Sequence, residues 1–308
     1  MAFTALDVKK LREMTNVGMM DCKAALAATD GDMDKAVDWL REKGLAKATK
    51  KADRIAAEGV AYATVVDGVG VVIEVNSETD FAAKTDSFMD LVKNLAVVVA
   101  QQNPADVEAL KACTYPNSTL TVTEIMQEKV MSIGENMQIR RFDRFATGTS
   151  VAYVHMGGTH GVLVNLEVEG DIDATEIGKN VAMQIAAMNA KYWDKSLVPQ
   201  AEIDKELSVQ LALMENDPKM ASKPAQVKEK IAAGKINAFF KDICLLQQDF
   251  VRSDIFQGDV AGYIADAGKK LGGSVKFVNA IHYVKGEGIE KKEENFAAEV
   301  AAQIAGAK

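Results

Sequence analysis

The spacing of apolar residues first predicts helices at the start of the chain. Residues 4–44 contain three short helical patterns, and the third has apolar side chains at positions i, i+4 and i+7. Thr4 and Asp32 are suited to cap the first and third of these helices, and Gly44 is a natural stop for the third. The basic stretch 45–54 predicts a linking helix. We therefore expect a small module of three helices followed by a linker.

A β pattern replaces the helical one at residues 60–75. This stretch is rich in β-branched side chains, and Asp67-Gly68 in its middle is a strong signal for a hairpin turn. From Thr85 the apolar period lengthens to that of a helix, with Phe88 on the apolar side. The sequence thus predicts a two-stranded hairpin followed by a helix.

This pattern of a hairpin and a helix occurs twice. The sequence GVGVVIEV at 68–75 is identical at five of eight positions to GVLVNLEV at 161–168. Val-Ala-Tyr at 60–62 recurs at 151–153, and a Lys-Asn pair stands in the helical stretch that follows each copy. We therefore expect a duplicated unit. The second copy has a shorter connection from strand to helix, and the missing residues correspond roughly to NSETDFA at 76–82.

The remaining chain predicts two further helices, a strand and a last helix. Apolar residues at helical spacing over 197–243 are interrupted by Pro218 and Pro224, which indicates an antiparallel helical hairpin. Residues 274–284 are strand-like. The stretch 286–308 has apolar residues along one helical side, so we expect it to form a C-terminal helix.

Composition and charge narrow the class of protein. A length of 308 residues suggests about two domains, and 48% hydrophobic residues are enough for sizeable cores. A net charge of -8 argues against a protein that coats a nucleic-acid backbone. The three cysteines are far apart, and neither a signal peptide nor a long apolar run is visible. We expect a reduced, cytoplasmic protein.

No catalytic centre is predicted. His155 and His160 flank the tip of a predicted hairpin and His282 is remote, so solvent-facing or packed imidazoles are favoured over metal ligands. The sequence contains no phosphate-binding loop, no nucleophile elbow and no zinc-protease motif. We therefore expect no cofactor and no metal site.

One basic-aromatic segment leaves an alternative open. IRRFDRF at 139–145 combines arginines with phenylalanines, as RNA-binding segments do. A strand with buried rings and solvated arginines explains the same residues, and the acidic composition favours that explanation. The alternative function is an RNA-associated translation adaptor that uses 139–145.

Several of these stretches together resemble the family of bacterial elongation factor Ts, the guanine-nucleotide exchange factor of the translation GTPase EF-Tu. The resemblance covers essentially the whole chain in the expected order. It is carried mainly by LREMTNVGMMDCKAAL at 11–26, EVNSETDFAAK at 74–84 and SIGENMQIRR at 132–141.

The resemblance implies an α+β fold with a ubiquitin-associated-like (UBA-like) three-helix module, two similar α/β core subdomains, an inserted antiparallel coiled coil and a C-terminal helical module. The implied domains are the UBA-like domain with its linker at 1–55, core subdomain N at 56–142, core subdomain C at 143–190 and 239–285, the coiled coil at 191–238, and the C-terminal module at 286–308.

The resemblance also implies a function through binding and no enzymatic reaction. The chain would bind EF-Tu with its GDP and disturb the site of Mg²⁺ and phosphate, so that GDP leaves and GTP can be loaded. Asp80 and Phe81 match the family's active loop, and Phe81 would enter a pocket between helices of the partner. The other positions that match partner contacts of the family are Lys9, Arg12, Met19, Met20, Lys23, Lys51, Ile133, Gly134 and His155.

The implied partner is EF-Tu, without direct contact to nucleic acid or membrane, and a larger assembly with EF-Tu is compatible with the resemblance. The residues alone leave two interpretations of Phe81 open, because the ring could anchor its own loop or enter a partner. The shorter second copy favours an outward ring. Met19 and Met20 are about 100° apart on a helix, so at least one should be exposed.

Overall fold

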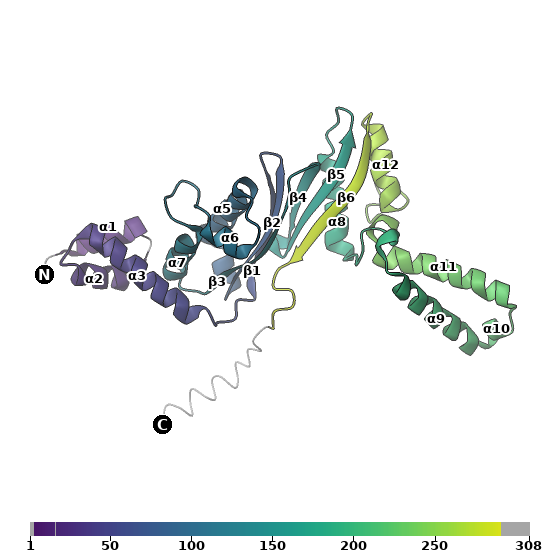
Figure 1. Ribbon diagram of the computed structural model, residues 1–308, viewed down its shortest axis with the longest axis horizontal. Helices are drawn as coiled ribbons and strands as arrows, with labels where there is room; N and C mark the ends of the chain where they lie inside the picture. Colours follow the sequence, from purple (N-terminus) through teal and green to yellow (C-terminus); the bar gives the residue numbers. More distant parts are fainter. Residues whose placement is uncertain (1–2, 16, 291–308) are drawn as a thin grey trace, which may run out of the picture. The chain divides into compact units, whose positions relative to one another are not determined.

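The structure, a computed structural model, describes residues 3–15 and 17–290 (Figure 1). The predicted C-terminal helix falls mainly on residues 291–308 and lies outside the described residues. The chain divides into two compact units. The first comprises Met1–Tyr62, Ile73–Phe142 and Tyr283–Lys308, and the second comprises Ala63–Val72 and Asp143–His282.

Three helices form the start of the first unit, as predicted. They are α1 (Ala5–Thr15), α2 (Met19–Ala28) and α3 (Met33–Lys51). Both predicted caps are confirmed: Thr4 exchanges hydrogen bonds with the first turn of α1, and the Asp32 carboxylate accepts one from the first turn of α3. Their small core consists of Val8, Leu11, Val17, Cys22, Ala25, Leu26, Ala36, Leu40 and, from α7, Met131.

The predicted stop at Gly44 is wrong, because α3 continues to Lys51. Gly44 lies inside this helix and faces α7 (Val122–Ile133). A Cβ atom on Gly44 would lie 3.4 Å from the Met131 sulfur. Gly44 is thus buried where α3 packs on α7, and the predicted linking helix is the second half of α3.

The first sheet has the strand order β1-β2-β3. Its strands are β1 (Glu58–Val66), β2 (Val69–Ser77) and β3 (Met137–Phe145). The predicted turn is confirmed, since Asp67 and Gly68 have φ angles of 49° and 82°, as a tight hairpin turn requires. Nearly every residue of β2 is buried, which explains its almost continuous apolar sequence.

Four helices follow β2 in the first unit. They are the one-turn α4 (Asp80–Ala83), α5 (Asp86–Gln102), α6 (Val107–Ala112) and α7. Thr85 caps α5, and the predicted apolar side of this helix is buried. That side includes Phe88, Leu91, Val92 and Leu95.

The second unit repeats the arrangement of a hairpin and a helix. Its sheet has the order β4-β5-β6, with β4 (Thr149–His155) antiparallel to β5 (His160–Glu169). The third strand is β6 (Ser274–Val284), and α8 (Thr175–Met188) packs on β4 and β5. Residues 78–85 connect β2 to α5, whereas only 170–174 connect β5 to α8. The shorter second connection is thus confirmed, and the longer first one contains α4.

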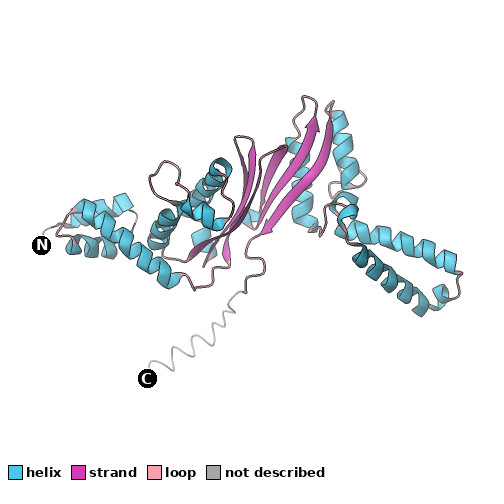
Figure 2. Ribbon diagram, viewed as in Figure 1, coloured by secondary structure: helices cyan, strands magenta, loops and turns pink. Residues whose placement is uncertain are grey.

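Helices make up the rest of the second unit (Figure 2). The predicted helical hairpin consists of α9 (Gln200–Asn216) and α11 (Ala225–Ile243), which pack against each other and are joined by α10 (Pro218–Ala221). Within the described residues, no helix combines the length and the apolar character needed to cross a membrane. The remaining elements are α12 (Val260–Lys270) and the 3₁₀ turns η1 (Met156–Gly158), η2 (Lys195–Leu197) and η3 (Leu245–Gln247).

Two helical glycines should respond in opposite ways to alanine. A Cβ on Gly178 of α8 would lie 2.4 Å from Val151 Cγ2, so Gly178→Ala should destabilise the fold by about 1–3 kcal/mol through overpacking. Gly234 of α11 has open space around it, so Gly234→Ala should stabilise its helix by about 0.5–1 kcal/mol. Urea unfolding monitored by circular dichroism measures both. A Gly178→Ala variant as stable as the wild type would contradict the close contact of α8 with β4, and a destabilised Gly234→Ala would contradict the open space around Gly234.

Candidate functional site

The connection from β2 to α5 is an ordered turn that carries Phe81 outward. The Thr79 hydroxyl accepts a hydrogen bond from Ala82 N at 3.2 Å and thereby caps α4. Ala82 and Ala83 are buried, whereas the Phe81 side chain is 80% exposed. The predicted loop is therefore a one-turn helix that packs on its small side chains. Phe81 is not used to anchor it.

Asp80 lies beside this ring and is paired within its own turn. The Lys84 ammonium donates a hydrogen bond to the Asp80 carboxylate at 2.5 Å. This hydrogen bond is the main reason why the pKa of Asp80 is lowered. Asp80 therefore remains a carboxylate next to the exposed ring at neutral pH.

The end of α7 holds this turn in place. The Glu135 carboxylate accepts hydrogen bonds from the backbone N–H and the hydroxyl of Thr79, at 2.9 and 2.6 Å. In return, the Glu78 carboxylate accepts one from Asn136 N at 2.6 Å. Gly134, at φ 90°, ends α7 and lets the chain turn toward these contacts.

The end of α3 completes the arrangement. The Asn136 side chain donates a hydrogen bond to Arg54 O at 2.8 Å, and the Lys51 ammonium donates one to Gly134 O. Arg54 also forms an ion pair with Glu78 at 3.5 Å. We call residues 51–54, 78–81 and 133–136 the loop cluster. It brings together five of the predicted site residues, namely Lys51, Asp80, Phe81, Ile133 and Gly134.

Removing the carboxylate of Glu135 should loosen the loop cluster without unfolding the protein. In Glu135→Ala, the Thr79 N–H and hydroxyl lose the acceptor that binds both. We expect amide hydrogen exchange at Thr79 to become about tenfold faster, which corresponds to one hydrogen bond of about 1.4 kcal/mol. Glu128→Ala, within the helix α7 that precedes Glu135, is the matched control. Unchanged protection at Thr79 would show that Glu135 does not hold the turn.

The predicted contacts of the N-terminal module lie on its surface. Met19 and Met20 begin α2 with 49% and 74% of their side chains exposed, so both are exposed where the sequence required only one. Lys9, Arg12 and Lys23 are exposed on α1 and α2. The module is tied to α7, because Arg41 of α3 donates a hydrogen bond to Glu128 at 3.0 Å.

His155 belongs to the second unit, at the exposed end of β4. Its Nδ1 lies 2.8 Å from the Tyr153 hydroxyl. His160 stands opposite His155 in the strand register, and His160 Nδ1 lies 3.0 Å from His282 Nε2 on β6. All three histidines of the chain therefore form one row. The sequence did not predict this row, because His282 is 122 residues from His160 and only the pairing of β6 brings it close.

Two arginines in the basic segment of β3 bind a buried carboxylate. Arg140 Nη1 and Arg141 Nε donate hydrogen bonds to Glu74 at 2.9 and 2.7 Å, and Gly286 N donates a third at 2.8 Å. Burial would raise the pKa of Glu74, but the bonds from Gly286 and both arginines outweigh burial and lower this pKa. Glu74 is thus a charged group at the centre of a polar network.

This network bears on the RNA interpretation of residues 139–145. The predicted strand is confirmed, and Phe142 and Phe145 are half-buried. The expectation of solvated arginines is wrong for Arg140 and Arg141, which bind Glu74. Two arginines that neutralise an internal carboxylate give the RNA interpretation no support.

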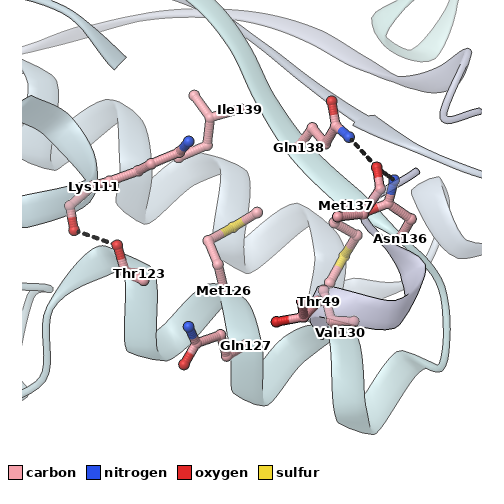
Figure 3. Close-up of a pocket in the computed structure, with 11 residues that line it drawn as sticks. Thr49, Lys111, Thr123, Met126, Gln127, Val130, Asn136, Met137, Gln138 and Ile139 are labelled. Atoms are coloured by element: carbon pink, nitrogen blue, oxygen red, sulfur yellow. Dashed lines mark hydrogen bonds between the residues drawn. The ribbon is translucent and has the colours of Figure 1, made fainter. Parts of the chain in front are cut away.

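A cavity of about 430 Å³ lies between the end of α3, α7 and β3 (Figure 3). Its described lining combines apolar side chains with uncharged polar ones, and its cationic residue, Lys111, forms an ion pair with Glu108 at 2.7 Å. Figure 3 shows the amides of Asn136 and Gln138 on one side, both bonded to Ala52 O. No acid-base pair faces the cavity among these residues, so its chemistry does not indicate catalysis.

Among the residues described, no group of three or more His, Cys, Asp or Glu side chains is arranged to hold a metal ion. The candidate site consists of an exposed ring, two exposed methionines and surface charges.

The family model described as Elongation factor TS matches residues 78–287. Elongation factor Ts of a Nitratiruptor species is 44% identical over 99% of the chain and 100% of the relative. Elongation factor Ts of Magnetococcus marinus is 42% identical over the same shares, and that of Clostridioides difficile is 44% identical over 98% of both.

Proposed function

The chain belongs to the elongation factor Ts family of translation factors, and on this premise we propose that it is a guanine-nucleotide exchange factor for the GTPase EF-Tu. It acts by binding and forms no covalent intermediate. It binds EF-Tu with GDP, disturbs the site of Mg²⁺ and phosphate, and leaves after GTP has entered. The Mg²⁺ belongs to the partner. The site of action is the cytoplasm, where translation factors work.

Phe81 is the observation that carries this proposal. Its ring is 80% exposed although Thr79, Glu135 and Asn136 hold the surrounding backbone in place. An exposed aromatic ring on a fixed support is suited to enter an apolar pocket, because little conformational entropy is lost on binding. We propose that Phe81 enters a pocket between helices of the nucleotide-binding domain, beside the Mg²⁺ site, with Asp80 at its rim.

The ring cannot supply the whole effect. Burial of a phenylalanine removes roughly 150–250 Å² from water, worth about 4–6 kcal/mol at about 25 cal/mol per Å². A nucleotide bound with nanomolar affinity has a binding free energy of about 12 kcal/mol in favour of the complex. Further contacts must therefore contribute to the displacement of GDP.

We assign these contacts to the other residues that match the family. Met19 and Met20 form an adaptable apolar surface, because methionine side chains adjust to irregular partners. Lys51, Ile133 and Gly134 extend the contact of the loop cluster, and His155 adds a contact from the second unit. The charged residues of the N-terminal grip are Lys9, Arg12 and Lys23.

We propose that each implied domain forms a separate part of the factor. Residues 1–55 form a UBA-like grip with its linker, and the two core subdomains occupy 56–142 and 143–190 with 239–285. Residues 191–238 form the coiled coil, and 286–308 form the C-terminal module. The pairing of α9 with α11 supports the coiled coil, and the three packed helices support the grip.

The binding of factor and nucleotide must be coupled in both directions. If the chain weakens GDP binding by a given factor, GDP weakens the binding of the chain by the same factor. Incoming GTP can therefore release the chain from EF-Tu. This reciprocity allows one molecule to serve many exchange cycles.

Release of fluorescent GDP from EF-Tu tests the proposal. EF-Tu loaded with the fluorescent nucleotide is mixed with excess GTP, with and without the chain, and the fluorescence decay gives the rate of release. We expect acceleration of at least about tenfold, or about 1.4 kcal/mol off the barrier. A rate equal to that of EF-Tu alone would overturn the proposal. An unrelated GTPase serves as the control for specificity.

A further inference from the structure

We propose that Tyr153 is a positioning residue for His155: its hydroxyl holds the imidazole with the proton on Nε2, as an outward hydrogen-bond donor for a carbonyl or carboxylate oxygen of the partner protein. This inference rests on the proposed function, because it assigns a chemical role to the His155 contact.

The first argument is the direction of the hydrogen bond. The Tyr153 oxygen and His155 Nδ1 are 2.8 Å apart. A phenol always carries a proton at neutral pH and is a good donor, whereas a neutral imidazole has one nitrogen that must accept. Donation from Tyr153 to Nδ1 leaves the imidazole proton on Nε2. His155 then presents a donor on the side away from Tyr153.

The second argument is that the two neighbouring imidazoles, His160 and His282, are hydrogen-bonded to each other. His160 Nδ1 and His282 Nε2 are 3.0 Å apart, and the centroids of the two rings are 5.2 Å apart. The difference between these two distances is about two ring radii, which is expected when both nitrogens lie close to the line between the centroids. The rings therefore meet end to end in an N–H···N bond. His160 Nδ1 is engaged with His282 and does not compete for His155, whose ring centroid lies 6.0 Å from that of His160.

The third argument is the exposure of the remaining nitrogen. His155 is exposed at the end of β4, and within the described chain no hydrogen bond to its Nε2 is found. Burial lowers the pKa of His160, so this neighbour is neutral at neutral pH. An oxygen acceptor is therefore the complement of the free Nε2–H of His155.

Nitrogen NMR of the free protein tests the position of the proton. The chain has only three histidines, so ¹⁵N-histidine labelling yields three ring systems. We expect the wild-type His155 spectrum to show Nε2–H and an Nδ1 that accepts a hydrogen bond. Tyr153→Phe should shift this Nδ1 signal to that of a free acceptor. Tyr62→Phe, the counterpart in the first copy of the repeat, is the matched control and should leave it unchanged.

Binding to EF-Tu with GDP tests the role of that proton. Tyr153→Phe should weaken binding by about three- to tenfold, the range of one neutral hydrogen bond. In His155→Gln the amide nitrogen occupies the Nε2 position, so affinity should be largely retained, whereas His155→Asn should lose it. Tyr153→Phe added to His155→Gln should have no further effect.

Two results would overturn the inference. An Nδ1–H signal in the wild type would show that His155 donates to Tyr153 and that Nε2 is an acceptor. If Tyr153→Phe binds EF-Tu with wild-type affinity while His155→Ala binds more weakly, Tyr153 has no positioning role, although His155 still contacts the partner. Wild-type affinity of His155→Ala would also remove His155 from the proposed contact surface, while exchange by the chain would still be measured separately.

Discussion

Phe81→Ala is expected to slow the release of GDP from EF-Tu by about 100-fold relative to the wild-type chain, and to weaken EF-Tu binding less. Truncating a phenylalanine that fills a pocket costs about 3–5 kcal/mol, and about 1.4 kcal/mol corresponds to a factor of ten in rate. The ring is 80% exposed in the free chain, so its removal leaves no cavity there. Stopped-flow release of fluorescent GDP gives the rate, and calorimetric titration gives the affinity.

Two controls separate this effect from a loss of structure. Leu271→Ala removes an apolar side chain that is 50% exposed, and it should exchange at the wild-type rate. Phe88→Ala, in the buried side of α5, should instead lower the free energy of unfolding by about 3–5 kcal/mol. If Phe81→Ala releases GDP as fast as the wild type, Phe81 is not the displacing group.

Glu74→Gln is expected to lower the free energy of unfolding by about 3 kcal/mol. The carboxylate is fully buried and neutralises two arginines whose side chains are only 28% and 31% exposed. Its loss leaves Arg140 partly buried without an ion-pair partner and leaves Arg141 with only the Glu287 carboxylate, at 3.2 Å, which costs more than the loss of a surface ion pair. Urea unfolding measures the change. Glu108→Gln breaks the exposed pair with Lys111 and should cost at most about 1 kcal/mol.

The same carboxylate should contribute to acid sensitivity. The folded chain holds the pKa of Glu74 below its usual value of 4.5, so its stabilising contribution is complete above about that pH. The contribution is lost as pH falls through the lower folded value. The difference in melting temperature between wild type and Glu74→Gln should therefore be constant from about pH 7 to about pH 5 and shrink below pH 4.5. A constant difference down to about pH 3 would contradict this role of the Glu74 charge.

Local chemistry explains why much of the fold could be predicted. Thr4, Asp32 and Thr85 cap helices through contacts within four residues, and Asp67-Gly68 sets a turn through its own backbone angles. Such features depend on neighbours in the sequence, so the sequence pattern is sufficient. The apolar periods of the strands and helices were informative for the same reason.

Gly44 shows where local rules fail. A glycine near the end of an apolar pattern is typical of a helix stop, yet here it lies in the middle of a longer helix. The glycine is buried where α3 packs on α7, and no local pattern contains a contact of this range. Tertiary packing therefore overrides the helix-stop preference of this residue.

The residues of the candidate site were predicted from the family motifs, whereas the contacts that hold them were not predicted. Asp80, Phe81, Ile133 and Gly134 were identified through the family motifs. The carboxylate that holds them, Glu135, binds Thr79 from 56 residues away. Likewise, the partners of Glu74 lie on β3 and in the segment after β6. Contacts of this range follow from the fold and are not encoded in spacing.

Because α3 is one continuous helix, it couples the two proposed contacts with the partner, that of Met19 and Met20 and that of the loop cluster. This helix of 19 residues is about 28 Å long, starts in the module that carries Met19 and Met20, and ends with Lys51 in the loop cluster. A stiff spacer of fixed length keeps the second binding surface at a high local concentration once the first has bound. For these proposed contacts, avidity then depends on the length and rotation of α3 and on its packing against α7. One inserted residue would turn the end of α3 by about 100°, and four would leave it about 40° from its original facing.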